Sequence, residues 1–141
     1  MLLPLWGCAT VSKLYPDLLH DEEALRIVES LPYDFSATAK SFGEYGMLTF
    51  AFRARKFDDI IRRYLTRFPG ATIVNIGAGM DTTFSCIDNG HIRWHDLDLP
   101  DAIAFRQTLI PEGTRSRCVG QHHISSVQPR LAEHRSVGCV N

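Results

Sequence analysis

The 141-residue sequence has no excess of charge of either sign, since its formal net charge is -1. Acidic and basic residues are spread along the chain, so there is no footprint for nucleic acid or an anionic membrane. No apolar run approaches the length of a membrane span, and the apolar start from Met1 to Trp6 has no basic segment and is interrupted by Pro4. We therefore expect no secretory signal, no membrane segment and no nucleic-acid partner.

The sequence also lacks any Cys-x-x-Cys pair, which excludes a thioredoxin-like redox site and a zinc knuckle. Its four cysteines are Cys8, Cys86, Cys118 and Cys139. Histidines near the last two of them are His122, His123 and His134. Their spacing fits no common structural zinc pattern, so no metal site is predicted. Separated, reduced thiols are typical of cytosolic proteins, and we expect a cytoplasmic location.

A stretch that does carry a clear pattern runs from Ala71 to Thr83 and predicts a strand, a glycine loop and a helix start. The residues before Gly77 are mostly β-branched and uncharged, which is typical of a parallel strand buried on both faces. Gly77 and Gly79 have no Cβ, so the main chain can turn tightly there and approach a ligand closely. Asp81 and the threonines after it can accept hydrogen bonds from the first turn of the helix, an end that attracts anions.

A second strand is predicted from Ile92 to Pro100. It places Asp98 about twenty residues after Gly77, the interval at which an acid reaches the ribose of an adenosine bound over the glycine turn. Asp96 is the alternative acid, on the same face by strand alternation, but the terminal position favours Asp98. The dinucleotide fingerprint would need a glycine where this chain has Thr82, so a cofactor without a pyrophosphate is favoured over NAD.

Hydrophobic periodicity predicts four helical segments. They are 21–31, 48–68, 84–87 and 101–110. The second segment has a broad apolar face that includes Phe52, Ile60 and Ile61, with Asp58 among the charged residues largely opposite. We expect this long helix to pack beside the sheet.

These residues resemble a known family. The run Asn75-Ile76-Gly77-Ala78-Gly79-Met80-Asp81-Thr82-Thr83-Phe84, followed by Asp98-Leu99-Pro100, is similar to the leucine carboxyl methyltransferase family, whose pattern is N-L-G-A-G-x-D-T and then D-x-P. The resemblance covers roughly Leu5 to Arg115. It implies an α/β fold of the class I methyltransferase type, with a Rossmann-like parallel sheet and N-terminal helices, and S-adenosyl-L-methionine as the cofactor.

The resemblance implies cofactor-binding roles for five residues. Gly77 and Gly79 would shape the cofactor bed, and Asp98 would hold the ribose. Arg53 and Lys13 would meet the methionine carboxylate of the cofactor, for which a guanidinium or an ammonium is a suitable partner. Without the resemblance, each of the two cations is an ordinary solvated residue on a helix.

The activity that the resemblance implies is methyl transfer to the oxygen of a carboxylate or hydroxyl, on a small molecule or a protein C terminus. Transfer from an activated sulfonium needs placement and exclusion of water more than acid–base groups, so no metal is required. No residue is predicted to act as the catalytic base. Four aromatic residues would either wall a substrate or adenine pocket or form core: Tyr33, Phe35, Tyr45 and Phe50. Cys8 stands where many relatives have an arginine, whose role is then lost.

The chain is expected to have three parts. Residues 1–70 form an N-terminal helical cap region, 71–115 the start of the cofactor-binding α/β core, and 116–141 an irregular tail. Beyond Arg115 the periodicity fades and no run predicts a buried strand, which leaves a two-stranded sheet with an unpaired edge. Such a tail is typical of an early termination, a frameshift or an incomplete gene model. A non-catalytic fragment or interaction module is therefore the main alternative to an enzyme, and an NAD-dependent oxidoreductase is a weaker one.

Overall fold

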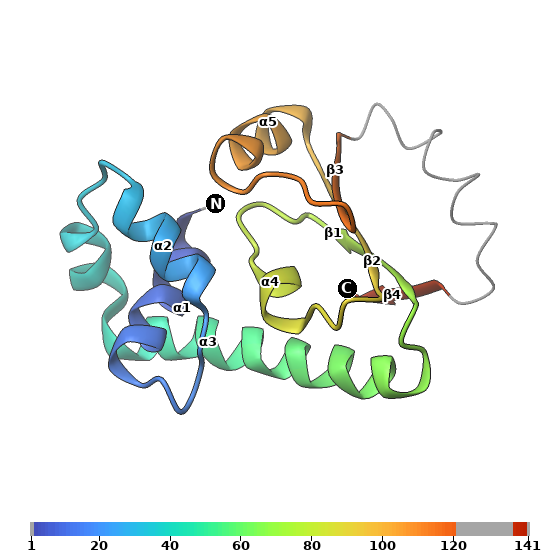
Figure 1. The fold of residues 1–141 in the computed structure, drawn as a ribbon. Helices are drawn as coiled ribbons and strands as arrows, with labels where there is room; N and C mark the ends of the chain where they lie inside the picture. The colour runs from blue at the N-terminus through green and yellow to red at the C-terminus, as the bar shows by residue number, and fades with distance from the viewer. Residues whose placement is uncertain (1, 121–136, 141) are drawn as a thin grey trace. The chain divides into compact units, whose positions relative to one another are not determined.

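The computed structural model describes residues 2–120 and 137–140, and Figure 1 shows its helices and strands. In chain order these elements are α1 (Leu2–Leu14), α2 (Glu22–Ser30), α3 (Ser36–Arg67), β1 (Thr72–Ile76), α4 (Thr83–Ile87), β2 (Arg93–Asp98), α5 (Pro100–Leu109), β3 (Ser116–Gly120) and β4 (Val137–Val140). The chain divides into two compact units. The helical unit is Met1–Arg62 with Met80–Ile87, and the sheet unit is Arg63–Gly79 with Asp88–Asn141. No helix in the described ranges is long and apolar enough to cross a membrane.

Helix α1 of the helical unit was not predicted from the sequence. Pro4 lies in its first turn, where the missing N–H group has no acceptor to lose, so the proline does not interrupt the helix. Most of its buried side chains are apolar: Leu5, Trp6, Cys8, Ala9 and Val11. The apolar start of the chain therefore contributes to the core of the helical unit.

Helix α2 confirms the helix predicted for 21–31. Asp21 caps it, since its Oδ1 accepts a hydrogen bond of 2.9 Å from the backbone N–H of Ala24. Glu22 and Glu23 occupy the first turn, where the helix dipole favours negative charge. The backbone N–H of Asp21 in turn donates to Ser12 Oγ of α1 at 3.0 Å. This buried hydrogen bond fixes the connection between the first two helices.

Helix α3 begins at Ser36, twelve residues or so before the start that the apolar pattern predicts. Gly43 breaks it with a φ of 57°, which explains why the helical period cannot be followed back through this segment. The predicted apolar face is only partly buried. Its buried members include Ile61 and Leu65, whereas Phe52, Ile60 and Phe68 are exposed.

The sheet unit contains a four-stranded parallel sheet in the order β3-β2-β1-β4. Ile73 of β1 is aligned with Trp94 of β2, and both side chains are buried. Strand β1 is buried at its first three residues and opens toward solvent at Ile76, so the expectation of burial on both faces holds only for its start. The α/β class with a parallel, Rossmann-like sheet is confirmed.

The expectation that no strand follows Arg115 is wrong for the described part of the tail. Residues 116–120 form β3, which pairs with β2, and 137–140 form β4, which pairs with β1. A short strand at the edge of a sheet needs no alternating pattern of its own, because its neighbour supplies the hydrogen bonds. Both β1 and β2 therefore have a neighbour on each side, and the predicted two-stranded sheet is corrected to four strands.

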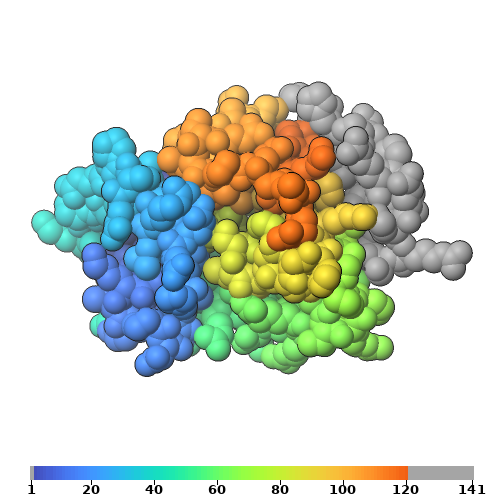
Figure 2. Space-filling model, in the orientation of Figure 1, coloured from blue at the N-terminus to red at the C-terminus, as the bar shows by residue number. Residues whose placement is uncertain are grey.

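Helix α5 connects β2 to β3 within the sheet unit. It begins with Pro100 at its first position, where a proline is well tolerated, and confirms the helix predicted for 101–110. The α5 side chains and the segment that follows form one continuous orange surface in Figure 2. Only Leu99 separates Asp98, the last residue of β2, from the start of α5.

Candidate functional site

The glycine loop follows β1 directly and is held against the end of β2. The backbone N–H of Gly77 donates to the carbonyl of Leu97 at 2.8 Å. Gly77 and Gly79 have φ angles of 71° and 48°, in the left-handed region that favours glycine. A Cβ built on Gly77 would meet no atom within 4 Å, so the constraint is the backbone conformation and the space above this glycine is open.

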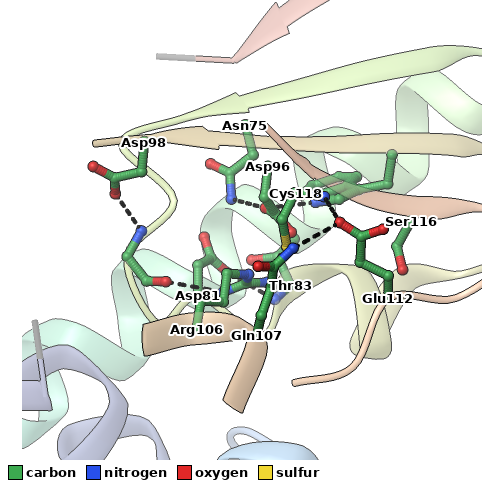
Figure 3. A network of polar contacts seen from close by, with 12 residues as sticks. Asn75, Asp81, Thr83, Asp96, Asp98, Arg106, Gln107, Glu112, Ser116 and Cys118 are labelled. Atoms are coloured by element: carbon green, nitrogen blue, oxygen red, sulfur yellow. Dashed lines mark hydrogen bonds and ion pairs between the residues drawn. The ribbon is translucent and has the colours of Figure 1, made fainter. Parts of the chain in front are cut away.

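Asp98 lies at the carboxyl end of β2 and reaches the same loop. Its Oδ2 accepts a hydrogen bond of 2.7 Å from the backbone N–H of Gly79 (Figure 3). Its Oδ1 accepts one of 2.7 Å from the backbone N–H of Leu99. Each carboxylate oxygen can accept further hydrogen bonds. The structure thus brings the glycine turn and the second-strand acid into direct contact, as the interval in the sequence predicts.

Asp96, the alternative acid, is in a different environment. It is 2% exposed and forms a 2.8 Å ion pair with Arg106 of α5, which is equally buried. Asp98 is only partly buried and lies at the end of the strand. A ligand over the glycine loop can therefore reach Asp98 without breaking a buried ion pair, and the role of Asp98 in binding a ribose stays a prediction.

The residues after the loop belong to the helical unit and form the start of α4. Asp81 Oδ1 accepts a hydrogen bond of 2.6 Å from the backbone N–H of Thr83, in agreement with the predicted helix start. Thr82 Oγ1 donates to Asp21 Oδ2 at 2.6 Å in a buried position. Where the dinucleotide fingerprint has its third glycine, this chain therefore uses a hydroxyl to hold the cap of α2.

Lys13 and Arg53 belong to the helical unit, whereas Gly77, Gly79 and Asp98 belong to the sheet unit. The Lys13 side chain is 70% exposed, and its Nζ lies 3.9 Å from Glu29 Oε1. Arg53 is an exposed residue of α3. Both cations are accessible to an anionic group, and their predicted roles stay predictions.

The sequence did not predict that two carboxyl groups of the helical unit, those of Asp21 and Asp58, are buried. Asp58 is 6% exposed although the apolar pattern places it on the charged face of α3. Burial raises its pKa to about 7, opposed by Arg62 and assisted by the charges of Asp81 and Asp21. Burial also raises the pKa of Asp21. The only signal in the sequence is that Asp58 lies between Phe57 and the apolar pair Ile60 and Ile61.

Burial in the helical unit also disfavours the thiolate form of two cysteines. Burial, together with nearby carboxylates, raises the pKa of Cys8 to about 12. The pKa of Cys86 is raised for the same reasons. Cys8, Cys86 and Cys118 are free cysteines.

The aromatic residues considered for a pocket lie in the helical unit and are not uniformly core. Tyr33 and Tyr45 are exposed, the latter by 85%, so these two are not core residues. The rings of Tyr33 and Phe35 meet edge to face at 4.7 Å. Phe50 packs on Gly7, where a Cβ would come within 2.9 Å of the ring.

The cysteines and histidines whose spacing was weighed against zinc patterns lie mainly in the tail. Within the described ranges no group of three or more histidine, cysteine or acidic side chains could hold a metal ion. Cys118 is described. The three histidines at positions 122, 123 and 134 lie outside the described residues, and of Cys139 only the backbone is described.

Comparison with known proteins supports the resemblance read from the loop and the acid. The family model for leucine carboxyl methyltransferase matches residues 9–131, further along the chain than the Arg115 limit expected from the sequence. The tetracenomycin polyketide synthesis O-methyltransferase TcmP of Streptomyces glaucescens is 32% identical over 104 residues, which is 73% of this chain and 38% of that protein. No solved structure matches the chain. The chain therefore belongs to the leucine carboxyl methyltransferase family.

Proposed function

We propose that this chain is the cofactor-binding part of an S-adenosylmethionine-dependent O-methyltransferase. The observation that carries the proposal is the 2.7 Å hydrogen bond between the Gly79 N–H and Asp98 Oδ2. It joins the glycine turn and the second-strand acid at the carboxyl edge of a parallel sheet, which is where this fold class binds its ligands. Membership of the methyltransferase family supports the same assignment.

The residues present fit an adenosyl cofactor. Gly77 and Gly79 leave the main chain open to close approach, and the remaining acceptor sites of Asp98 suit the two ribose hydroxyls. Lys13 and Arg53 are accessible cations of the type that pairs with the carboxylate of an amino acid. When bound, the cofactor would supply a methyl group already activated on a sulfonium, so the protein's task is placement and exclusion of water.

The methyl acceptor is proposed to be an oxygen of a carboxylate or hydroxyl. The name of the relative from Streptomyces glaucescens describes an O-methyltransferase of polyketide synthesis, which favours a small-molecule acceptor over a protein C terminus. The chain spans 38% of the length of that relative, so the activity of a whole enzyme is part of the proposal. The cytoplasmic location stays a prediction from the cysteine spacing.

Titration calorimetry tests the cofactor assignment. We expect heat of binding with S-adenosylhomocysteine and none with NAD, because Thr82 replaces the third glycine of the dinucleotide fingerprint. Asp98→Asn should weaken binding about tenfold, since a carboxylate accepts from hydroxyls more strongly than an amide does. Asp101→Asn, which changes an exposed acid of α5, is the matched control and should bind as the wild type does.

Two results would overturn this assignment. Binding of NAD alone would favour the oxidoreductase alternative. Binding of neither ligand by a cooperatively folded protein would favour the non-catalytic module.

A further inference from the structure

The polar groups of one loop residue, Gly79, are held from two sides. Its N–H donates to Asp98 Oδ2 at 2.7 Å, and its carbonyl accepts a hydrogen bond of 3.1 Å from one terminal amino group of Arg106. The first partner comes from β2 and the second from α5, as Figure 3 shows. Gly79 is also one of the two loop residues with a left-handed backbone. Its orientation therefore depends on side chains of two different elements.

Arg106 is itself fixed by a buried network. Its other terminal amino group donates to Asp96 Oδ2 at 2.8 Å. The second oxygen of Asp96 accepts a hydrogen bond of 3.0 Å from Asn75 Nδ2 (Figure 3). The same oxygen accepts one of 2.8 Å from Trp94 Nε1. A continuous set of contacts thus runs from β1 through β2 and α5 to the glycine loop.

Stability alone does not account for this arrangement. Burying an ion pair carries a desolvation cost, and well-packed apolar side chains of similar volume often stabilise a core at least as well. A guanidinium adds something that an apolar side chain lacks, because its planar fork donates to two acceptors at fixed angles. Here one acceptor is the carboxylate of Asp96 and the other is the Gly79 carbonyl. Arg106 therefore connects the Asp96 carboxylate in the sheet to the Gly79 carbonyl in the loop.

We propose that Arg106 and Asp96 are positioning residues, which hold the Gly79 peptide so that Asp98 is presented to the ribose of the cofactor; this inference rests on the proposed function. Neither residue needs to contact the cofactor. Their removal should reduce affinity for the cofactor through Asp98, and changes at Arg106 and Asp98 should not be additive.

The test uses a double variant in which the buried charges are removed together. Asp96→Asn with Arg106→Met leaves an oxygen for Trp94 and Asn75 and leaves no uncompensated charge, so the fold is expected to survive. The matched control is Arg115→Met, which breaks the more exposed 2.5 Å ion pair with Asp88 in the same unit. Urea unfolding verifies that each variant folds cooperatively.

Two measurements follow on the folded variants, the exchange rate of the Gly79 amide by NMR and the affinity for S-adenosylhomocysteine by calorimetry. In the double variant we expect Gly79 exchange at least about tenfold faster, because its hydrogen bond opens more often. Affinity should fall about tenfold, which corresponds to about 1.4 kcal/mol. Adding Asp98→Asn to the double variant should lower the affinity for S-adenosylhomocysteine little further. The same substitution in the wild type should lower this affinity about tenfold.

Wild-type exchange and wild-type affinity in the folded double variant would overturn the inference. So would full additivity of the double variant with Asp98→Asn. If the wild type itself gives no heat with S-adenosylhomocysteine, the proposed function fails separately. Faster Gly79 exchange in the double variant would then still support the positioning of the loop, and unchanged exchange would refute it.

Discussion

The charged residues of the sheet unit and those of the helical unit are arranged on different principles. In the sheet unit the buried acid, Asp96, is matched by a buried cation, and the predicted ribose acid contacts the predicted glycine loop directly. In the helical unit the buried acids, Asp21 and Asp58, have no ion pair among the described residues, while the predicted cofactor cations are exposed. The buried acid of the sheet unit is therefore paired with a cation that also contacts the glycine loop, whereas burial raises the carboxyl pKa values in the helical unit.

The largest effect on the free energy of unfolding is expected at the buried ion pair of the sheet unit, between Asp96 and Arg106. Asp96→Ala should lower the free energy of unfolding by about 3–5 kcal/mol, because it leaves the Arg106 guanidinium buried and unpaired. Asp88→Ala removes the carboxylate of the more exposed pair with Arg115 and should cost about 1 kcal/mol or less. Urea denaturation monitored by tryptophan fluorescence measures both. Equal costs would remove the contrast between buried and exposed pairs.

The second effect concerns pH and the helical unit. Burial raises the pKa of Asp58 from its ordinary value of 3.8 to about 7, so the folded state binds this proton more tightly than the unfolded state does. Its contribution to stability is therefore present below about pH 4 and is lost as the pH rises to about 7, by up to about 1.4 kcal/mol per pH unit.

Asp58→Asn should flatten this pH dependence and stabilise the protein at pH 8. Asp59→Asn is the matched control. The Asp59 carboxylate is next in the sequence, but it is partly exposed and pairs with Arg55 at 3.4 Å. Unfolding free energies measured from pH 4 to pH 8 make the comparison. A slope that persists in Asp58→Asn would assign the pH dependence to another group, such as Asp21.

A smaller effect is expected in the glycine loop. Gly77→Ala places a Cβ on a residue with a φ of 71° and should cost about 1–2 kcal/mol of stability. Gly70→Ala is the control, because a Cβ there also meets no atom within 4 Å and its φ is not in the left-handed region. Loss of stability at both positions alike would mean that the backbone conformation is not the cause.

The smallest effect on stability is expected at the predicted cofactor cations. Lys13→Met should change the free energy of unfolding by about 0.5 kcal/mol or less, because its ion pair with Glu29 is exposed and long. Its affinity for S-adenosylhomocysteine should nevertheless fall about tenfold, as expected for the loss of one charge-assisted contact. Unchanged affinity would remove Lys13 from the proposed site.

The sequence predicted those parts of the structure that depend on local pattern. The strand predicted before Gly77 is present, the α2 cap at Asp21 matches the start predicted for that helix, and the spacing from Gly77 to Asp98 brings the loop and the acid into contact. Each of these follows from neighbouring residues or from the regular geometry of a strand, turn and helix.

The features that were missed depend on partners distant in the sequence. Strands β3 and β4 are stabilised by pairing with β2 and β1, which a local apolar pattern does not reveal. Arg106 looks like an ordinary helix residue until its contacts with Asp96 and Gly79 are seen. The burial of Asp58 likewise depends on tertiary packing that overrides its place on the polar side of the helix.

The strand order has a consequence for how the protein folds. Strand β1, which leads into the glycine loop, receives its second neighbour from residues 137–140, far along the chain. Closing so long a connection is entropically costly, so this pairing is expected to be late and the sheet slow to assemble. Until then β1 offers its backbone to other chains, and refolding yields should fall as protein concentration rises.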